Sequence, residues 1–411
     1  MQNTLNSTLW NAPGETLRRW WKSPAIRIPV LIFVTARFLT LIIGVTAVQL
    51  GPVYNPYVSD KIFVESLEAR QPSSFLAPLI DPWHRWDTGW YLKVAVKGYS
   101  ADDGSVIFAP LYPALSAAVG VVVGDTLLGA LIVSSIACLA FLLILYQLAQ
   151  LETHSERVAS TTLLALIAFP TAFYLLAGYT ESPFLAFVAG TLLAARQRRW
   201  WIVTVLAALA TLTRIQGSLL IFPIAWLAFV DTPRFWQGIT WRERIRQSIP
   251  RLAAMGSGPL MALCFFGYLW LEKLGTVSAA YEKYWALEVR APWESVIDVI
   301  GRIVAGHASA TEIMGLVALV IIVVLAVASL RVLPFAYQCY MWPTLALILM
   351  RYYTPTLLNG TMRYVLDFFP IFITAAVFLA RHPRWRLVWI SVGVVLQLFM
   401  VFLFARWMWI A

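Results

Sequence analysis

Charged residues, cysteines and histidines are scarce in this chain of 411 residues. Only 13% of the residues are charged, whereas 60% are hydrophobic and 19 are tryptophan; a soluble domain has about 25% charged residues. A soluble globule of this size cannot bury so much apolar surface and still present a polar exterior. The composition therefore excludes a soluble enzyme, a disordered protein and a secreted disulfide scaffold. It predicts an all-α, multi-pass integral membrane protein.

The 3 cysteines and 4 histidines are too few and too scattered for a metal or redox site of the usual spacing. Cys138, Cys264 and Cys339 each lie in an apolar run without a second cysteine nearby, so we expect buried small hydrophobic side chains. A metal site built from carboxylates stays open, with Asp81 and Asp87 as candidates. The sequence itself requires no cofactor, and it predicts no metal ligand from histidine or cysteine.

Apolar runs that could cross a membrane follow one another along most of the chain, since about 20 apolar residues span the hydrocarbon core. Twelve are recognised, at 28–50, 107–123, 126–149, 159–177, 182–195, 200–213, 217–230, 252–271, 313–330, 332–350, 363–380 and 387–405. No linker or low-complexity tract separates them, so residues 1–411 are expected to form a single membrane domain. The first 27 residues are polar and basic and show no cleavage-site pattern, which predicts that the first run is a retained signal anchor.

The positions of the basic residues predict the topology. If residues 1–27 are cytoplasmic and every run crosses, the arginine clusters at 196–199, 242–246 and 381–386 all fall outside, against the positive-inside rule. If the run 107–123, which has two prolines near its start, instead returns to the outer face, all three clusters become cytoplasmic. We therefore predict eleven transmembrane helices, with the N-terminus inside and the C-terminus outside.

This topology divides the net charge of +10 unevenly between the two faces. Cytoplasmic segments carry +12, outer segments carry −3, and Arg37 in the first run supplies the remaining charge. The inner excess is expected to meet anionic lipid head groups. Two outer segments are long, 51–125 and 272–312, and their many aromatic residues predict structure at the membrane interface, with juxtamembrane helices in the first.

The densest polar cluster runs from Asp81 to Asp87 with the sequence DPWHRWD, and an amphipathic helix pattern, TGWYLKVAVKGY, follows it. Lys93 and Lys97 are one helical turn apart on this pattern, and Gly98 is a natural helix end. Asp87 falls at the helix N-terminus, where two hypotheses stay open. It is either an ordinary N-cap or a carboxylate held at the membrane surface as a general base.

Later charged residues interrupt or border apolar runs. Glu181 follows a tight turn, and Arg214 breaks an apolar stretch, where a charge is costly unless it is paired or solvated. Arg363 precedes Asp367 by one helical turn, so these two residues can pair with each other. Arginines at membrane depth also suit the binding of a phosphate. Together with Asp87 they suit a reaction on a lipid-linked anionic substrate.

The segment Arg85-Trp86-Asp87, followed by Tyr91 and by Lys97-Gly98-Tyr99, resembles the RWDxxxYxxIAxxGY pattern of the PIG-V family. Later motifs agree in order: residues 108–113 (FAPLYP) with FFPLYP, 179–182 (YTES) with YSES, 213–217 (TRIQG) with TRSNG, and 362–364 (MRY) with 369–370 (FP). The resemblance covers about 85 to 370. Members of this family are polyprenyl-phosphate-mannose-dependent mannosyltransferases, related to the enzyme for the second mannose of the GPI anchor.

The resemblance implies a GT-C glycosyltransferase fold and an inverting transfer of mannose at the outer face, from polyprenyl-phosphate-mannose to a lipid-linked or cell-surface glycan or glycolipid. Asp87 is implied as the general base. Contacts with the donor phosphate or the substrates are expected from His84, Arg85, Trp86, Tyr91, Tyr112, Glu181, Arg214, Gln216, Arg363 and Tyr364. The compact chain suggests a prokaryotic plasma-membrane member (the endoplasmic reticulum membrane in a eukaryote). No nucleic-acid partner is expected.

Departures from the family pattern leave the acceptor open. Gly89 and Trp90 replace a bulkier pair, Ala109 replaces an aromatic residue, and Ile215-Gln216 replaces Ser-Asn. Two other functions are alternatives: a transporter or flippase of lipid-linked substrates, and a GT-C enzyme that uses a different sugar. A transporter typically has repeated halves and charge near the midplane, and this sequence shows no repeat.

Overall fold

A computed structural model describes residues 21–56, 58–68, 70, 75–232 and 240–410, and most of these residues are helical. Most of the predicted cytoplasmic segment 1–27 therefore lies outside the described residues. The first elements are α2 (Pro24–Gln49), α3 (Lys61–Glu68), α4 (Ala77–Ile80), η1 (Asp81–Trp83), α5 (Asp87–Lys97), η2 (Gly104–Ile107), α6 (Leu111–Val123), α7 (Thr126–Thr153), α8 (Glu156–Ile167), η3 (Ala172–Leu175), α9 (Glu181–Arg196) and α10 (Trp200–Thr213).

The remaining elements complete the bundle and add one small sheet. They are η4 (Ile215–Leu220), α11 (Ile221–Ala225), η5 (Trp226–Val230), α12 (Trp241–Leu271), α13 (Val277–Trp285), β1 (Leu287–Val289), α14 (Glu294–Val304), α15 (Ala310–Ser329), α16 (Phe335–Leu349), β2 (Arg351–Tyr353), α17 (Thr361–Tyr364), η7 (Val365–Phe368), α18 (Pro370–Arg381) and α19 (Pro383–Ala405).

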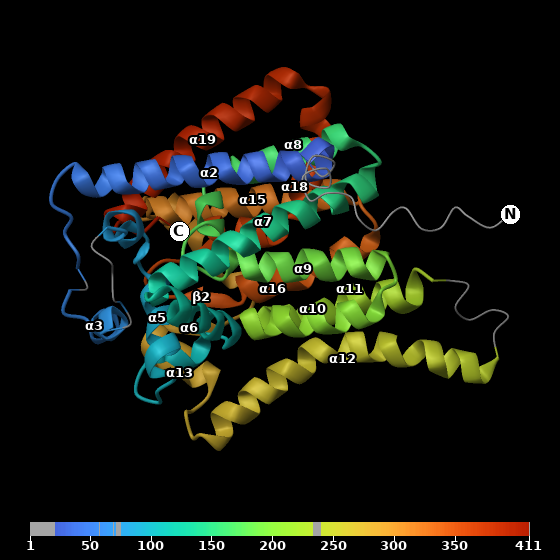
Figure 1. Cartoon of the computed structure of the whole chain (residues 1–411), viewed down its shortest axis with the longest axis horizontal. Coiled ribbons are helices and arrows are strands. Elements are labelled where there is room, and N and C mark those ends of the chain that lie inside the picture. The colour runs from blue at the N-terminus through green and yellow to red at the C-terminus, as the bar shows by residue number, and fades with distance from the viewer. Residues whose placement is uncertain (1–20, 57, 69, 71–74, 233–239, 411) are drawn as a thin grey trace, which may run out of the picture.

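The long helices run roughly side by side (Figure 1). Five of those described, α2, α7, α12, α15 and α19, are long and apolar enough to cross a membrane. A sixth is added if α17–η7 and α18, which are bent by 76° at their junction, count as one span. Their outward faces are apolar: Phe38 of α2 is 62% exposed and Val320 of α15 is 54% exposed. These features confirm an all-α, multi-pass membrane fold. The count of eleven spans stays a prediction.

Besides the bent run 363–380, the predicted runs 159–177 and 217–230 are also interrupted in the structure. The run 159–177 forms α8, which ends before Pro170, and then the short η3. Proline lacks the backbone N–H that a continuing helix needs, which explains the break. The run 217–230 is divided among η4, α11 and the π-helical η5. Neither run is one continuous helix, so the sequence was wrong about their continuity.

The run 107–123 contributes α6, a helix of 13 residues. At about 1.5 Å per residue it is roughly 20 Å long, shorter than the hydrocarbon core. It ends at Gly124, whose φ of 80° favours glycine, and the Asp125 side chain then caps α7. A Cβ on Gly129 would lie 2.6 Å from backbone atoms of Ser116 and Gly120, so α6 and α7 pack closely as a hairpin. How α6 lies relative to a membrane stays a prediction.

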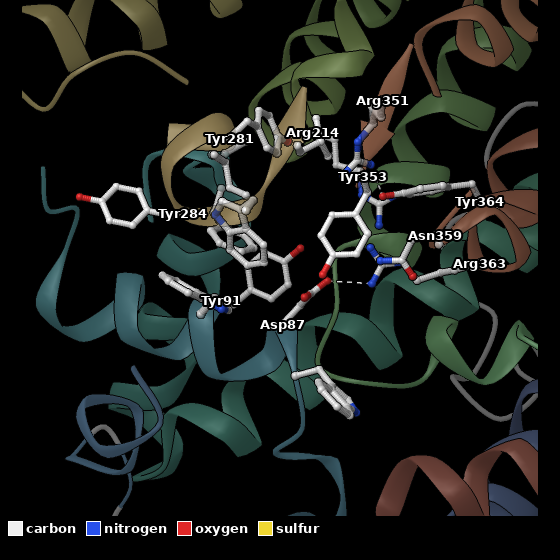
Figure 2. Close-up of a pocket in the computed structure, with 18 of the residues that line it drawn as sticks. Asp87, Tyr91, Arg214, Tyr281, Tyr284, Arg351, Tyr353, Asn359, Arg363 and Tyr364 are labelled. Carbon is white, nitrogen blue, oxygen red and sulfur yellow. Dashed lines mark hydrogen bonds and ion pairs between the residues drawn. The ribbon is translucent and has the colours of Figure 1, made fainter. Parts of the chain in front are cut away.

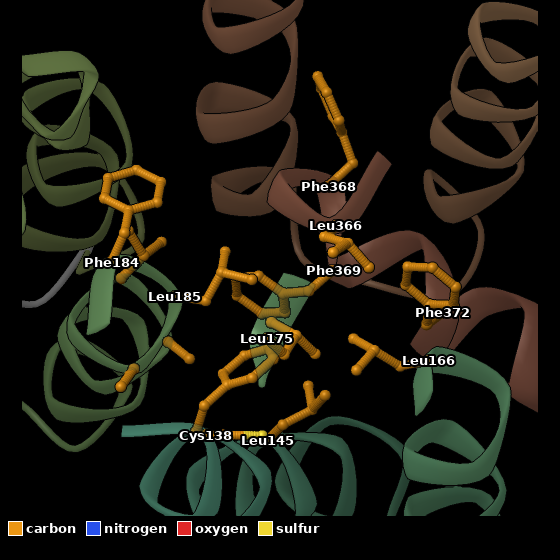
Figure 3. Close-up of a cluster of buried hydrophobic side chains, with 14 of the residues drawn as sticks. Cys138, Leu145, Leu166, Leu175, Phe184, Leu185, Leu366, Phe368, Phe369 and Phe372 are labelled. Atoms are coloured by element: carbon orange, nitrogen blue, oxygen red, sulfur yellow. The ribbon is translucent and has the colours of Figure 1, made fainter. Parts of the chain in front are cut away.

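The core lies between α7, α8, α9 and α18 (Figure 3). Phe369 packs edge-on against Phe141, with ring centroids 5.7 Å apart. Cys138 is buried in this core as the sequence predicted, but Cys264 is exposed on α12 and Cys339 is only partly buried. The prediction of burial was therefore wrong for these two, because an apolar membrane helix also has an outward face.

Both long segments that the topology assigned to one face meet at one end of the bundle. Figure 1 shows α3, α5, α6, α13 and β2 gathered there, whereas the α9–α10 and α18–α19 turns and the start of α12 lie toward the opposite end. Strand β1 pairs antiparallel with β2, with Val289 opposite Arg351 and Leu287 opposite Tyr353. The sheet thus joins segment 272–312 to the chain that follows α16. Which end of the bundle faces the cytoplasm stays a prediction.

Candidate active site

A cavity of about 750 Å³ lies at this end of the bundle, bordered by α5, η4, α13, β2 and residues near the C-terminus (Figure 2). Eight residues that the sequence predicted for the site line it: His84, Trp86, Asp87, Tyr91, Arg214, Gln216, Arg363 and Tyr364. Glu181 lies behind the wall and pairs with two of the lining arginines. Arg85 and Tyr112 are buried and do not line the cavity.

Asp87 occupies the first turn of α5, directly after a strained residue. Trp86 has φ 52° and ψ −122°, a conformation that costs a non-glycine residue roughly 1–3 kcal/mol and that is typical of functional sites. No side chain caps the helix, so the N-cap hypothesis for Asp87 is wrong. Instead, Oδ2 of Asp87 accepts a hydrogen bond of 2.7 Å from Nη1 of Arg363. Within the described chain Oδ1 makes no hydrogen bond, and the side chain is 17% exposed.

Arg363 connects Asp87 to a second carboxylate. Its Nε lies 3.3 Å from Oε1 of Glu181, which is 1% exposed. The guanidinium also lies over the rings of Tyr174 and Tyr179, at 5.6 and 5.5 Å from their centroids. The pairing of Arg363 with Asp367 that the helical spacing allowed is not found among the described ion pairs, and Asp367 pairs with Arg214 instead. Four tightly packed partners hold Arg363 toward α5 and α9 instead.

Arg214 pairs with Glu181 and with Asp367. Its Nη2 lies 2.5 Å from Oε1 of Glu181, and its Nη1 lies 3.2 Å from Oδ1 of Asp367. Gln216 donates to Oδ2 of Asp367 at 2.9 Å. We call Asp87, Arg363, Glu181, Arg214 and Asp367 the ion-pair cluster. It contains three carboxylates and two guanidiniums, so its formal charge is negative.

Tyr91 packs behind Asp87 and contacts the same cluster. Its hydroxyl lies 3.1 Å from Oγ1 of Thr180, which accepts a 2.7 Å hydrogen bond from Nε of Arg214. Burial, reinforced by the charge of Asp87, raises the pKa of Tyr91, so its phenol is neutral at physiological pH. Tyr112 lies one layer deeper, with its hydroxyl 2.9 Å from Oγ of Ser134. Tyr112 of α6 packs edge-on against Tyr91 with ring centroids 5.0 Å apart, and so supports α5 from the bundle side.

His84 and Arg85 both make hydrogen bonds with other parts of the protein. Burial, together with Arg70 and Arg85, lowers the pKa of His84 to about 3, so this imidazole is uncharged at neutral pH. One of its nitrogens lies 2.8 Å from Oγ of Ser66. Arg85 donates from Nε to the carbonyl of Ala405 at 2.9 Å. It thereby ties the start of α5 to the end of α19.

The expected position of Lys93 on a polar helix face needs correction, whereas the candidate metal site at Asp81 and Asp87 stays open. Lys93 was expected on a polar helix face, but it is buried and forms a 2.6 Å ion pair with Asp103, because η2 folds over that face. Asp81 pairs with Arg70 at 2.6 Å. Among the residues that the structure describes, no three His, Cys, Asp or Glu side chains are grouped as a metal site. A divalent metal requirement remains untested.

The sequence missed four residues that line the cavity. Tyr281 and Tyr284 of α13, together with Arg351 and Tyr353 of β2, line it, and we call these four residues the tyrosine wall. Figure 2 shows Arg351 and Tyr353 on the same side as Arg363 and Tyr364, with Tyr281 and Tyr284 toward the other side. Successive strand residues point to opposite faces. This alternation was the available signal, but a strand of three residues is too short to recognise in a sequence.

Comparison with known proteins gives one informative match. The chain is 25% identical over 246 residues to GPI mannosyltransferase 2 of Schizosaccharomyces pombe; the match covers 54% of this chain and 51% of that protein. The chain thus spans about half the length of the curated relative it matches. No family model matches the chain, and no solved structure matches it either. The chain is therefore similar, at a distance, to a GPI mannosyltransferase.

Proposed function

We propose that this protein is an inverting glycosyltransferase that moves mannose from polyprenyl-phosphate-mannose to a hydroxyl group of a lipid-linked or cell-surface glycan. The observation that carries the proposal is the position of Asp87. It lies on the wall of a large cavity, with one carboxylate oxygen fixed by Arg363 and the other without a hydrogen bond from any residue that the structure describes. A carboxylate that is oriented but still has a free oxygen is suited to act as a general base. The distant similarity to GPI mannosyltransferase 2 supports the sugar.

The proposed reaction is a single displacement at the anomeric carbon of the donor. The acceptor hydroxyl oxygen attacks the anomeric carbon of the mannosyl phosphate while Asp87 Oδ1 takes its proton. The bond between that carbon and the phosphate oxygen breaks, and its electron pair leaves with the polyprenyl phosphate. Attack opposite the leaving group converts a β-linked donor into an α-linked product. The reaction needs no redox partner, and a divalent metal requirement is left open.

The ion-pair cluster holds the base during this step. Arg363 orients Asp87, and Glu181 holds Arg363 from the opposite side. Such a network needs little reorganisation when charge moves, which is how enzymes lower barriers electrostatically. We propose that the reaction takes place on the outer face of a prokaryotic plasma membrane; the position of the basic turns at the opposite end of the bundle supports the outer face.

A transporter or flippase of lipid-linked substrates is the alternative from another class. The cavity lies at one end of the bundle beside the long segments, whereas transporter sites typically lie near the midplane between repeated halves. This placement favours an enzyme. An enzyme that uses a different sugar differs only in the donor, and the assay below tests it directly.

The test is sugar transfer by purified protein in lipid nanodiscs. Polyprenyl-phosphate donors carrying mannose, glucose or galactose are offered with a panel of glycolipid acceptors. We expect transfer from the mannose donor, and a rate that is about 10²–10⁴-fold lower in Asp87→Asn, because proton transfer to a placed base is lost. Asp102→Asn, an exposed carboxylate of the same segment, is the control and should keep the wild-type rate. Full activity of Asp87→Asn would sink the assignment of the base. Translocation of the lipid-linked sugar without transfer would favour the flippase.

A further inference from the structure

We propose that Arg351, with Tyr281, binds the phosphate of the lipid-linked donor, whereas Arg214 and Arg363 serve to hold the base. The inference rests on the proposed function and assigns the phosphate subsite to a residue of β2. It starts from the three arginines that line the cavity and from the different surroundings of each.

The positive charges of Arg214 and Arg363 are already balanced by carboxylates. Each lies within 4 Å of two carboxylates of the ion-pair cluster. The cluster as a whole has one more carboxylate than guanidiniums, so it has no net positive charge to attract an approaching anion. A phosphate entering the cavity therefore needs a cation outside the cluster.

Arg351 is such a cation. Among the described residues no carboxylate forms an ion pair with it, and its buried Nε has no hydrogen-bond partner. The guanidinium donates from Nη1 to the hydroxyl of Tyr364 and lies between two rings, 5.3 Å from the centroid of Tyr364 and 5.7 Å from that of Tyr281. A guanidinium presents several donors in a fixed plane and binds phosphate oxygens in pairs. A half-buried guanidinium that faces a cavity and has no carboxylate partner among the described residues is thus suited to bind an anion.

Tyr281 supplies a second donor at the same place. Its hydroxyl makes no hydrogen bond within the described part of the chain, and it lines the cavity from α13. Burial raises the pKa of Tyr281 above its ordinary value. The phenol therefore keeps its proton at neutral pH and can donate it to a phosphate oxygen.

The sheet fixes Arg351 in this position. Arg351 pairs with Val289 of β1, and both Arg351 and Tyr353 line the cavity, whereas the intervening Tyr352 is buried on the opposite side. The main chain of β1 therefore determines which side chain faces the phosphate.

An apolar surface leads to Arg351. The cavity wall beside it includes Ile215, Val277, Leu347, Ile348 and Met350. Leu347 is 39% exposed on α16, so this wall reaches the outer surface of the bundle. An isoprenoid chain can lie along such a surface with its phosphate at Arg351 and its sugar toward Asp87. The ligand class is therefore a phosphate ester of a long apolar alcohol, not a free phosphate.

The experiment measures binding and transfer separately in nanodiscs. Binding of a polyprenyl monophosphate, the proposed product, is titrated for wild type, Arg351→Gln, Arg351→Lys and Arg290→Gln. Arg290 is the matched control, because it lies two residues beyond β1's Glu288, pairs with it at 2.8 Å and lines no part of the cavity. We expect dissociation constants that are at least about tenfold higher in Arg351→Gln and intermediate in Arg351→Lys. Those of Arg290→Gln should be unchanged. Wild-type affinity in a folded Arg351→Gln overturns the inference.

Further measurements distinguish a failure of the phosphate site from a failure of the proposed function. If Arg351→Gln does not fold, Tyr281→Phe replaces it, and we expect about threefold weaker binding from the loss of one donor; unchanged binding there also overturns the site. Inorganic phosphate that binds as tightly as the lipid phosphate contradicts the lipid assignment. If wild type binds the lipid phosphate but transfers no sugar, the proposed function fails and the phosphate site stands. If wild type transfers mannose and Arg351→Gln keeps the wild-type KM for the donor, the site fails and the function stands.

Discussion

The ion-pair cluster and the tyrosine wall border the same cavity but carry charge differently. In the cluster every guanidinium already contacts two carboxylates, and two of the carboxylates, Glu181 and Asp367, are almost fully buried. In the wall a single guanidinium, that of Arg351, contacts aromatic rings and a phenol. A closed network of ion pairs can fix a geometry but has no charge left for a ligand. An uncompensated cation attracts a ligand but needs a rigid support, which the sheet provides.

The largest expected effect comes from the arginine that holds the base. Arg363→Gln should lower kcat about 10²-fold, because misplacing a catalytic group by about 1 Å costs that much. The KM for the lipid donor should change less than about threefold, since Arg351 and Tyr281 are the residues proposed to bind its phosphate. Steady-state kinetics in nanodiscs, with donor and acceptor varied in turn, measures both constants.

Arg196→Gln is the matched control for this variant. Arg196 also pairs with a buried carboxylate, Glu152, at 2.7 Å, but at the opposite end of the bundle. It should affect stability without changing kcat. A large rise in donor KM for Arg363→Gln, with kcat retained, would show that the ion-pair cluster binds the donor. It would contradict the assignment of donor binding to the tyrosine wall.

The next effect concerns stability. Glu181→Gln removes the carboxylate that both cluster arginines share, and we expect the free energy of unfolding to fall by about 3 kcal/mol, as is typical when one partner of a buried pair is removed. Thermal unfolding in detergent measures the change. Glu288→Gln removes a half-exposed carboxylate beside the tyrosine wall and should change stability by less than about 0.5 kcal/mol. Equal effects of the two variants would contradict the view that only the cluster is a closed network.

The smallest effect is a pH dependence at the edge of the cavity. Because the pKa of folded His84 is about 3, and that of an unfolded histidine is about 6.5, the unfolded chain binds this proton more tightly. The free energy of unfolding should therefore fall by about 1.4 kcal/mol for each pH unit below about 6.5. His84→Gln should lose this part of the acid dependence, measured as the unfolding midpoint between pH 7 and 5. If the unfolding midpoint of His84→Gln depends on pH as that of wild type does, His84 contributes nothing to the acid dependence and the prediction fails. The exposed His382→Gln serves as the control.

Local pattern was enough for the class of fold and for one helix. The apolar runs at 28–50, 126–149, 313–330 and 387–405 correspond to α2, α7, α15 and α19. The helix after the polar cluster is also confirmed, since α5 runs from Asp87 to Lys97 and ends at Gly98. These predictions succeeded because hydropathy and helix ends depend on residues close together in the chain.

The pairing of charges could not be predicted in the same way. Arg363 and Asp87 are 276 positions apart, and the nearer partner, Asp367, was a reasonable choice by helical spacing. Arg351 was missed entirely, because its role depends on pairing with a strand more than 60 positions earlier. In a nearly apolar bundle each charge finds its partner through tertiary packing, which a single sequence does not display.

The three-residue sheet makes the specificity of the site depend on register. Side chains alternate along a strand, so a shift by one residue exchanges its two faces. A single residue inserted before Arg351 would turn that guanidinium toward Val299 and Leu357, where Tyr352 now packs, and would bring Tyr352 to the cavity. The base and the ion-pair cluster would remain in place. One added amino acid in β2 would then separate the ability to activate an acceptor from the ability to hold a donor.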